Sequence, residues 1–266
     1  MPSIGSVSAG EYRNHLNRLA RRDLLPPDHL AVFLAGSRVR GWGNVSSDLD
    51  VYVICEQEWT GAGGARALVT VRPERIMVES RTIDRQRWDI QYWLDTQVTQ
   101  VLAKVSWQEF DNNFSASNLL TSAEADLLER LTYAVPLAGE DWLAKRREEI
   151  QGSALGPVLV ARALHWAGVF AEDARGQLAS GDVESAVLSA RLAFGNAIRA
   201  LLADNGKFAQ SAKWFARQFR EIEQGVLSFQ EYWDIETMRT YDPADPARWV
   251  EDVMMVCDRI SLNVVI

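Results

Sequence analysis

The sequence is poor in the residues that build disulfide frameworks and zinc sites. It has only two cysteines, Cys55 and Cys257, among 266 residues, and its three histidines are scattered along the chain. Disulfide-stapled folds and Cys/His zinc sites need dense, closely spaced copies of these residues. The sequence therefore predicts neither a disulfide framework nor a histidine-based metal site.

Positive charge is also in short supply. Lys and Arg number 28 against 36 Asp and Glu, which gives a net charge of −8 at pH 7. General nucleic-acid binding depends on cations that neutralise phosphates, usually gathered in a basic stripe. We therefore expect no nucleic-acid partner, and the acidic balance favours a cationic one.

Long hydrophobic runs are missing, as is a basic start followed by an apolar stretch. A membrane-spanning helix needs about 20 consecutive apolar residues, and a secretory leader needs the basic–apolar pattern. The sequence therefore predicts a cytoplasmic protein that does not associate with membranes.

What the chain does contain indicates two structural regions. Hydrophobic residues make up 47% and charged residues 24%, a composition typical of globular proteins. Up to about residue 120, the patterns predict a helix over 8–24 capped by Ser8, then strands at 30–35, 48–54, 75–80 and 88–94. After residue 120, the patterns predict a helix that starts at Thr121 and further helices near 141–150, 155–179, 183–204, 209–224 and 245–262. The helix over 155–179 is apolar nearly all round, so we expect it inside a bundle.

The most informative segment joins a glycine–serine turn to a pair of aspartates. Gly36 and Ser37 follow the first predicted strand, and Asp48 and Asp50 begin the second. Residues i and i+2 of a strand point to the same face, where two carboxylates repel unless a cation lies between them. Mg²⁺ prefers such oxygen ligands and leaves positions open for phosphate oxygens. A glycine turn lets the backbone approach a phosphate closely.

A third carboxylate, Asp89, lies in the strand predicted at 88–94. Its neighbours Trp88 and Ile90 point to the opposite side, so Asp89 faces the aspartate pair if the two strands are adjacent. Three carboxylates on one face can hold two metal ions for phosphoryl or nucleotidyl transfer. Asp89 could instead take the proton of an attacking hydroxyl, and the sequence leaves both roles open.

These residues resemble a known family. The run LAGSRVRGWGNVSSDLDVYVI resembles the signature of the nucleotidyltransferase superfamily that includes DNA polymerase beta, and WDIQYWL resembles its third-carboxylate strand. The order of the two regions is similar to that of antibiotic nucleotidyltransferases, especially aminoglycoside adenylyltransferases, in which VPLAGEDW at 135–142 fits the connector. The resemblance implies an α+β fold. A nucleotidyltransferase α/β domain with a mixed sheet would span 1–120, and a helical, substrate-binding bundle would span 121–266.

The resemblance also implies roles for the motif residues. Asp48 and Asp50 would hold Mg²⁺, Gly36 and Ser37 would contact the triphosphate, and Asp89 would be the third carboxylate and catalytic base. The aminoglycoside enzymes carry Glu at this third position, whereas Asp is usual elsewhere in the superfamily. The departure puts the assignment of the base in doubt.

Five further residues are candidate nucleotide contacts: Arg38, Arg40, Ser47, Arg191 and Lys213. The two loop arginines could neutralise triphosphate charge, and the serine could orient Asp48 or bind a phosphate oxygen. The resemblance implies that a lysine of the helical domain reaches the phosphates, which favours Lys213 over Arg191. For each of these residues, a solvated surface side chain is the alternative.

The residues that bind the acceptor are the hardest to predict from the sequence. Trp166 and Asp173 lie on one face of the helix over 155–179, with Phe170 between them. An aromatic wall beside a carboxylate would suit a cationic, sugar-like acceptor. Core aromatics with an exposed aspartate are the alternative.

Together these observations predict a Mg²⁺-dependent nucleotidyltransferase. It would move AMP from ATP to a hydroxyl of a small molecule, with an aminoglycoside-like antibiotic as the best single expectation. Two alternatives stay open at this stage. One is the same chemistry on a biosynthetic intermediate or a protein, and the other is a non-catalytic nucleotide-binding module.

Overall fold

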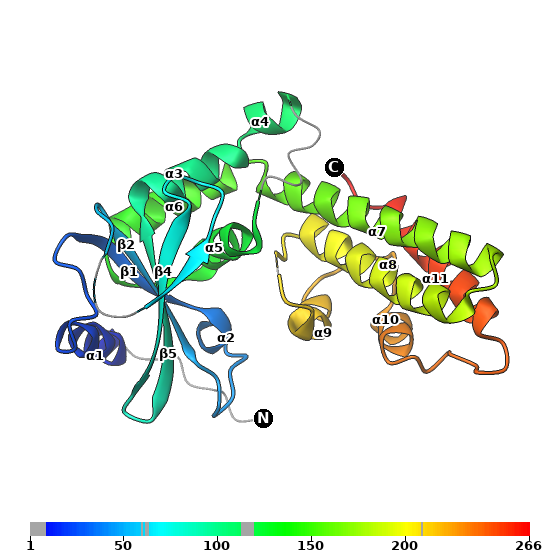
Figure 1. Ribbon diagram of the computed structural model, residues 1–266, viewed down its shortest axis with the longest axis horizontal. Coiled ribbons are helices and arrows are strands. Elements are labelled where there is room, and N and C mark those ends of the chain that lie inside the picture. The colour runs from blue at the N-terminus through cyan, green and yellow to red at the C-terminus, as the bar shows by residue number, and fades with distance from the viewer. Residues whose placement is uncertain (1–8, 60, 62–63, 113–119, 209) are drawn as a thin grey trace. The chain divides into compact units, whose positions relative to one another are not determined.

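The computed structural model describes residues 9–59, 61, 64–112, 120–208 and 210–266, and it divides into two compact units (Figure 1). Unit 1 holds the described residues up to Ser153, and unit 2 holds those from Ala154 to Ile266. The residue patterns predict the change between the two regions at 120/121. Unit 1 extends beyond that point because a later strand, β6, pairs with the first strand of the sheet.

Unit 1 is built on a six-stranded mixed sheet with the strand order β3-β4-β5-β2-β1-β6. The strands are β1 (His29–Ala35), β2 (Leu49–Cys55), β3 (Ala65–Leu68), β4 (Arg75–Ile83), β5 (Gln86–Leu94) and β6 (Val135–Ala138). The central pair β2 and β5 is parallel, and every other pairing is antiparallel. With the helices that follow, this confirms the predicted α+β class with a mixed sheet.

Helices cover both faces of the sheet. Helix α1 (Ala9–Ala20) lies on one side, where Leu19 packs in a core with Val51, Trp88 and Ile90. The other side carries α3 (Asp95–Lys104), α5 (Ser122–Tyr133) and α6 (Glu140–Gln151), as Figure 1 shows. Because side chains alternate along a strand, β2 turns Val51 toward α1 and turns Asp50 toward the α5 side.

Several local expectations for unit 1 are confirmed. Helix α5 begins with the predicted capping box, in which Thr121 Oγ1 accepts from the Glu124 amide at 3.3 Å and Glu124 Oε2 accepts from the Thr121 amide at 3.0 Å. Strands β4 and β5 contain the predicted runs at 75–80 and 88–94. Ser8, the expected cap of the first helix, lies outside the described residues.

Other expectations for unit 1 are wrong. The first helix ends at Ala20 rather than at 24, and Asp23 just beyond it has a left-handed φ of 52° that no helix can continue through. Residues 135–138, the first half of the segment that resembles a connector, form strand β6, which was not predicted, because they pair with β1. The short helix α4 (Trp107–Asn112) and the helix α3 were not predicted.

Unit 2 is helical. Its long helices are α7 (Leu155–Ala179), α8 (Val183–Asp204) and α11 (Pro246–Ser261), joined by η2 (Ala212–Trp214), α9 (Phe215–Phe219) and α10 (Phe229–Glu236). Asp182 caps α8 as predicted by accepting from the Ser185 amide at 3.2 Å, and Gly206 ends it with a φ of 70°. Helix α8 has the length and hydropathy of a membrane-spanning helix, but 67% of that stretch is buried within the protein, as in a core helix.

Two expectations for unit 2 are corrected. Helix α7 is not enclosed, because it buries one side against α8 and α11 and leaves His165, Trp166 and Asp173 exposed. The continuous helix expected over 209–224 is replaced by the short η2 and α9. Helix α10, which begins with a Ser228–Glu231 capping box, was not predicted.

Candidate functional site

The glycine–serine turn lies where β1 passes directly into the short helix α2 (Gly36–Val39). Gly36 has a φ of +78°, and a Cβ atom built there would stand 1.7 Å from Oδ2 of Asp50. Any other residue would collide with that carboxylate and strain the backbone. The close approach of this turn to Asp50 therefore requires glycine.

The three predicted aspartates come together on the α5 side of the sheet. Asp50 of β2 stands directly opposite Asp89 of the parallel strand β5, and Asp48 lies two residues before Asp50. The side chains of Asp48 and Asp89 share a hydrogen bond, and Ser80 of β4 donates to Asp89 Oδ1 at 2.5 Å. The structure thus brings together residues from three strands and the turn, as alternation along the strands predicted.

The carboxylates of the site differ in their pKa values. Burial, reinforced by repulsion from Asp48 and Asp89 and opposed by Arg130, raises the pKa of Asp50 to about 6. Burial and the hydrogen bond with Asp89 also raise the pKa of Asp48. Burial works against ionisation of Asp89, yet the hydrogen bonds it accepts, led by that of Ser80, keep its pKa below its usual range. Asp89 therefore stays ionised to lower pH than Asp50.

Sequence reasoning missed Arg130, the residue of α5 that faces Asp50. Its Nη1 atom lies 3.8 Å from Asp50 Oδ2, and the arginine side chain is only 19% exposed. In the sequence, Arg130 stands out only as a charged residue close to Leu127, Leu128 and Leu131, which are buried in the structure. That signal does not say which strand the arginine meets.

The three predicted contacts in the loop have partners within the protein. Arg38 Nε donates to the Ser47 carbonyl oxygen at 2.9 Å, and Ser47 Oγ accepts from the Asn44 amide at 2.9 Å. Arg40 pairs with Glu129 of α5 at 3.0 Å. Its guanidinium also stacks on two aromatic rings, 3.8 Å from the centre of Trp42 and 4.6 Å from that of Tyr133. The first two contacts hold the loop to itself, and those of Arg40 attach it to α5.

The three carboxylates offer the type of oxygen ligand that a hard divalent cation prefers. Three carboxylates share one face of adjacent strands, and their mutual repulsion is the kind that a bound cation relieves. In the part of the chain that the structure describes, no three His, Cys, Asp or Glu side chains are already gathered around one point. Asp50 instead faces Arg130, while Asp89 turns to Ser80 and to Arg87, whose Nε lies 3.2 Å from Oδ1. Gathering one ion would therefore require side-chain rotations.

The comparisons with known proteins describe the chain as a whole. No protein family matches it, and no curated protein does. One solved structure that it resembles is a nucleotidyltransferase-like protein from Exiguobacterium sibiricum 255-15. The two are 12% identical with a TM-score of 0.47, and the match covers 94% of this chain and 74% of the other. The case for function therefore depends on the site's own residues.

Unit 2 contains a pocket of about 520 Å³ between α8, α10 and the η2–α9 segment. The predicted Arg191 lines it, together with Arg199, Phe215 and Glu236. Burial lowers the pKa of Arg199, and its Nε has no hydrogen-bond partner within the described residues. Sequence reasoning missed this arginine. A desolvated guanidinium in a pocket is a natural contact for an anionic group.

The other predicted residues of unit 2 lie on its surface. Lys213 is in η2, exposed, with its Nζ 5.4 Å from the ring centre of Trp214. Trp166 is 40% exposed on α7, with its ring 5.9 Å from that of Phe170, and Asp173 is exposed on the same helix. The tryptophan is therefore not a core residue.

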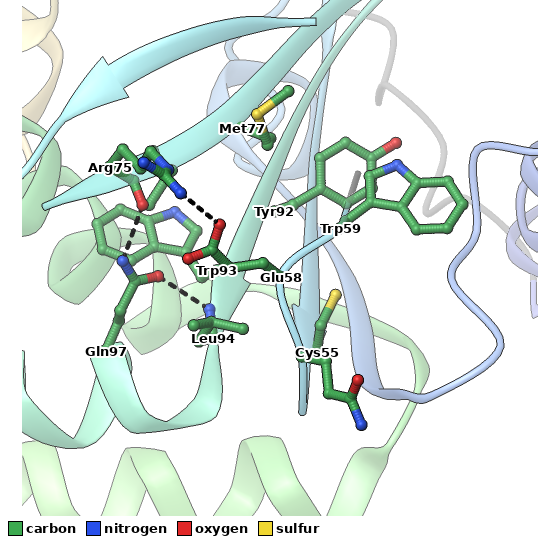
Figure 2. A pocket seen from close by; sticks show the side chains of 11 residues that line it. Cys55, Glu58, Trp59, Arg75, Met77, Tyr92, Trp93, Leu94 and Gln97 are labelled. Carbon is green, nitrogen blue, oxygen red and sulfur yellow. Dashed lines mark hydrogen bonds and ion pairs between the residues drawn. The ribbon is translucent and has the colours of Figure 1, made fainter. Parts of the chain in front are cut away.

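Unit 1 contains a small hollow at the carboxyl ends of β2 and β5 (Figure 2). Its volume of about 20 Å³ suffices only for a water-sized guest. Gln97 bridges the Leu94 amide at 3.0 Å and the Arg75 carbonyl at 2.9 Å, as Figure 2 shows. Burial raises the pKa of Cys55, which lines this hollow, to about 12, so its thiol stays protonated. This hollow therefore has no room for a substrate.

Proposed function

We propose that this chain is a Mg²⁺-dependent nucleotidyltransferase that moves AMP from ATP to a hydroxyl group of a small molecule. One observation carries the proposal. Asp50 stands opposite Asp89 on adjacent parallel strands, and its carboxylate packs against the Gly36 turn so closely that a Cβ atom there would overlap it. Carboxylates beside a glycine turn suit a cation that must also bind phosphate oxygens.

In this proposal each site residue has a separate task. Asp48, Asp50 and Asp89 would hold Mg²⁺, which when bound supplies positive charge for the triphosphate. Gly36 and Ser37 would lie against the phosphates, where the missing Cβ leaves room for close approach. Asp89, kept ionised by the hydrogen bonds it accepts, is also the residue able to receive the proton of the acceptor hydroxyl.

For the acceptor we propose an aminoglycoside-like, cationic sugar. Two features support this choice, namely the exposed Trp166 with Asp173 on the same helix and the net charge of −8. An aromatic face and a carboxylate both attract ammonium groups. Arg191 and Lys213 remain predicted nucleotide contacts, and the partnerless Nε of Arg199 adds that residue to them.

The test is pyrophosphate release with ATP, Mg²⁺ and a panel of hydroxylated antibiotics. We expect release with the wild type and a loss of at least about 100-fold in Asp50→Asn, because an oxygen ligand with charge is replaced by a neutral amide. Asp84→Asn is the matched control, since Asp84 belongs to an exposed ion pair with Arg18 and Arg22. Full activity in Asp50→Asn would refute the mechanism, and nucleotide binding without turnover would favour a non-catalytic module.

A further inference from the structure

Helix α5 presents one polar face to the site. Asp126, Glu129, Arg130 and Tyr133 are spaced at three and four residues, which places them along one side of the helix. Glu129 holds Arg40 of the loop that follows the glycine turn, at 3.0 Å. The same helix therefore contacts both the loop and the carboxylates.

On this face, the guanidinium of Arg130 lies beside Asp50 and the Gly36 turn. It lies 3.8 Å from Asp50 Oδ2, and its Nη1 atom lies 3.2 Å from the point where a Cβ of residue 36 would be. Its centre is 5.8 Å from the ring of Tyr52, which is fully buried. Arg130 Nε has no hydrogen-bond partner among the residues that the structure describes, so the side chain is not held there by a dense hydrogen-bond network of its own.

We propose that Arg130 is a positioning residue, a fixed counter-charge that holds the Asp50 carboxylate against the Gly36 turn before the cation arrives. The inference rests on the proposed function, because it concerns how the carboxylates are prepared for a metal ion. Arg130 does not itself contact the ion in this account.

The surroundings of Asp50 explain why such a charge is needed. Asp48, Asp89 and Asp126 all act on Asp50 with the same sign of charge, and burial removes the water that would otherwise screen them. Arg130 is the cation that opposes them at Asp50. Helix α5 holds this cation close to Asp50. The carboxylate is therefore already ordered before the metal binds.

The test measures metal binding directly rather than turnover. Mn²⁺ affinity at pH 8 is determined by electron paramagnetic resonance for the wild type, Arg130→Met and Arg130→Lys. We expect Arg130→Met to bind Mn²⁺ at least about tenfold more weakly, because the carboxylate loses its restraint. Arg130→Lys should recover most of the affinity, since it restores the charge at nearly the same place.

Arg146→Met is the matched control. Like Arg130, Arg146 is an arginine of unit 1 on the side of the sheet that carries α5, and it is buried. It pairs with Asp95 at 2.6 Å and with Glu149 at 2.8 Å, away from the site. This variant should lower the melting temperature without changing the Mn²⁺ affinity. Circular dichroism checks that each variant is folded, and Arg130→Gln replaces Arg130→Met if the latter does not fold.

Three results would overturn the inference. They are Mn²⁺ binding in Arg130→Met that equals or exceeds that of the wild type, an equal loss in Arg146→Met, or no recovery in Arg130→Lys. Each of these leaves the proposed function standing, because the wild type still binds the ion. A wild-type protein that does not bind Mn²⁺ at all would instead overturn the metal-dependent function and this inference with it.

Discussion

Replacing Gly36 with alanine perturbs the site through a single methyl group. The added Cβ would lie 1.7 Å from Asp50 Oδ2, whereas ordinary contact begins at 3.4 Å, so the carboxylate must retreat by about 1.7 Å. A misplacement of about 1 Å at a reacting centre can cost about 100-fold in rate. We therefore expect Gly36→Ala to lose at least about 100-fold in pyrophosphate release and to bind Mn²⁺ more weakly.

The backbone cost of this substitution can be separated from the collision. Gly41 also has a left-handed φ, of +69°, but a Cβ there would meet nothing within 4 Å. Both alanine variants should lose about 1–2 kcal/mol of stability from the left-handed backbone, which corresponds to about 2–8 °C in melting temperature. Only Gly36→Ala should lose activity and Mn²⁺ affinity. Equal activity in the two variants would refute the reasoning that places Asp50 against the turn.

Two further predictions concern titration. Because the pKa of Asp50 in the folded protein, about 6, lies above its unfolded value, the native state binds the extra proton, and stability is lost as pH rises. Unfolding by urea should show the wild type losing about 2 kcal/mol relative to Asp50→Asn between pH 4 and pH 7, and a difference that does not vary with pH would contradict this. Burial raises the pKa of both Cys55 and Cys257 to about 12, so a thiol reagent at pH 8 should label them only after unfolding. Rapid labelling of the folded protein would contradict the burial of both side chains.

The parts of the fold that the sequence predicted correctly depend on local rules. Helix α8 runs from Val183 to Asp204 because Asp182 caps its start and Gly206 takes the left-handed conformation past its end. The shared face of Asp50 and Asp89 follows from the alternation of side chains along strands, once β2 and β5 are neighbours. These signals lie within a few residues of the feature that they determine.

The parts that could not be predicted depend on contacts between distant segments. Strand β6 is four residues long and contains Pro136, so its own sequence does not indicate a strand, and its pairing with β1 creates it. Arg130 cannot be predicted as a site residue until α5 is known to face β2. The exposed side of α7 likewise depends on which of its faces α8 and α11 cover.

We propose above that Asp48, Asp50 and Asp89 hold a divalent cation beside the Gly36 turn. The most direct measurement is anomalous diffraction from crystals grown with Mn²⁺ and a non-hydrolysable ATP analogue. We expect an anomalous peak within coordination distance of oxygens from all three aspartates, with the phosphates against Gly36 and Ser37. A nucleotide bound with its metal elsewhere, or no peak at these carboxylates, would contradict it.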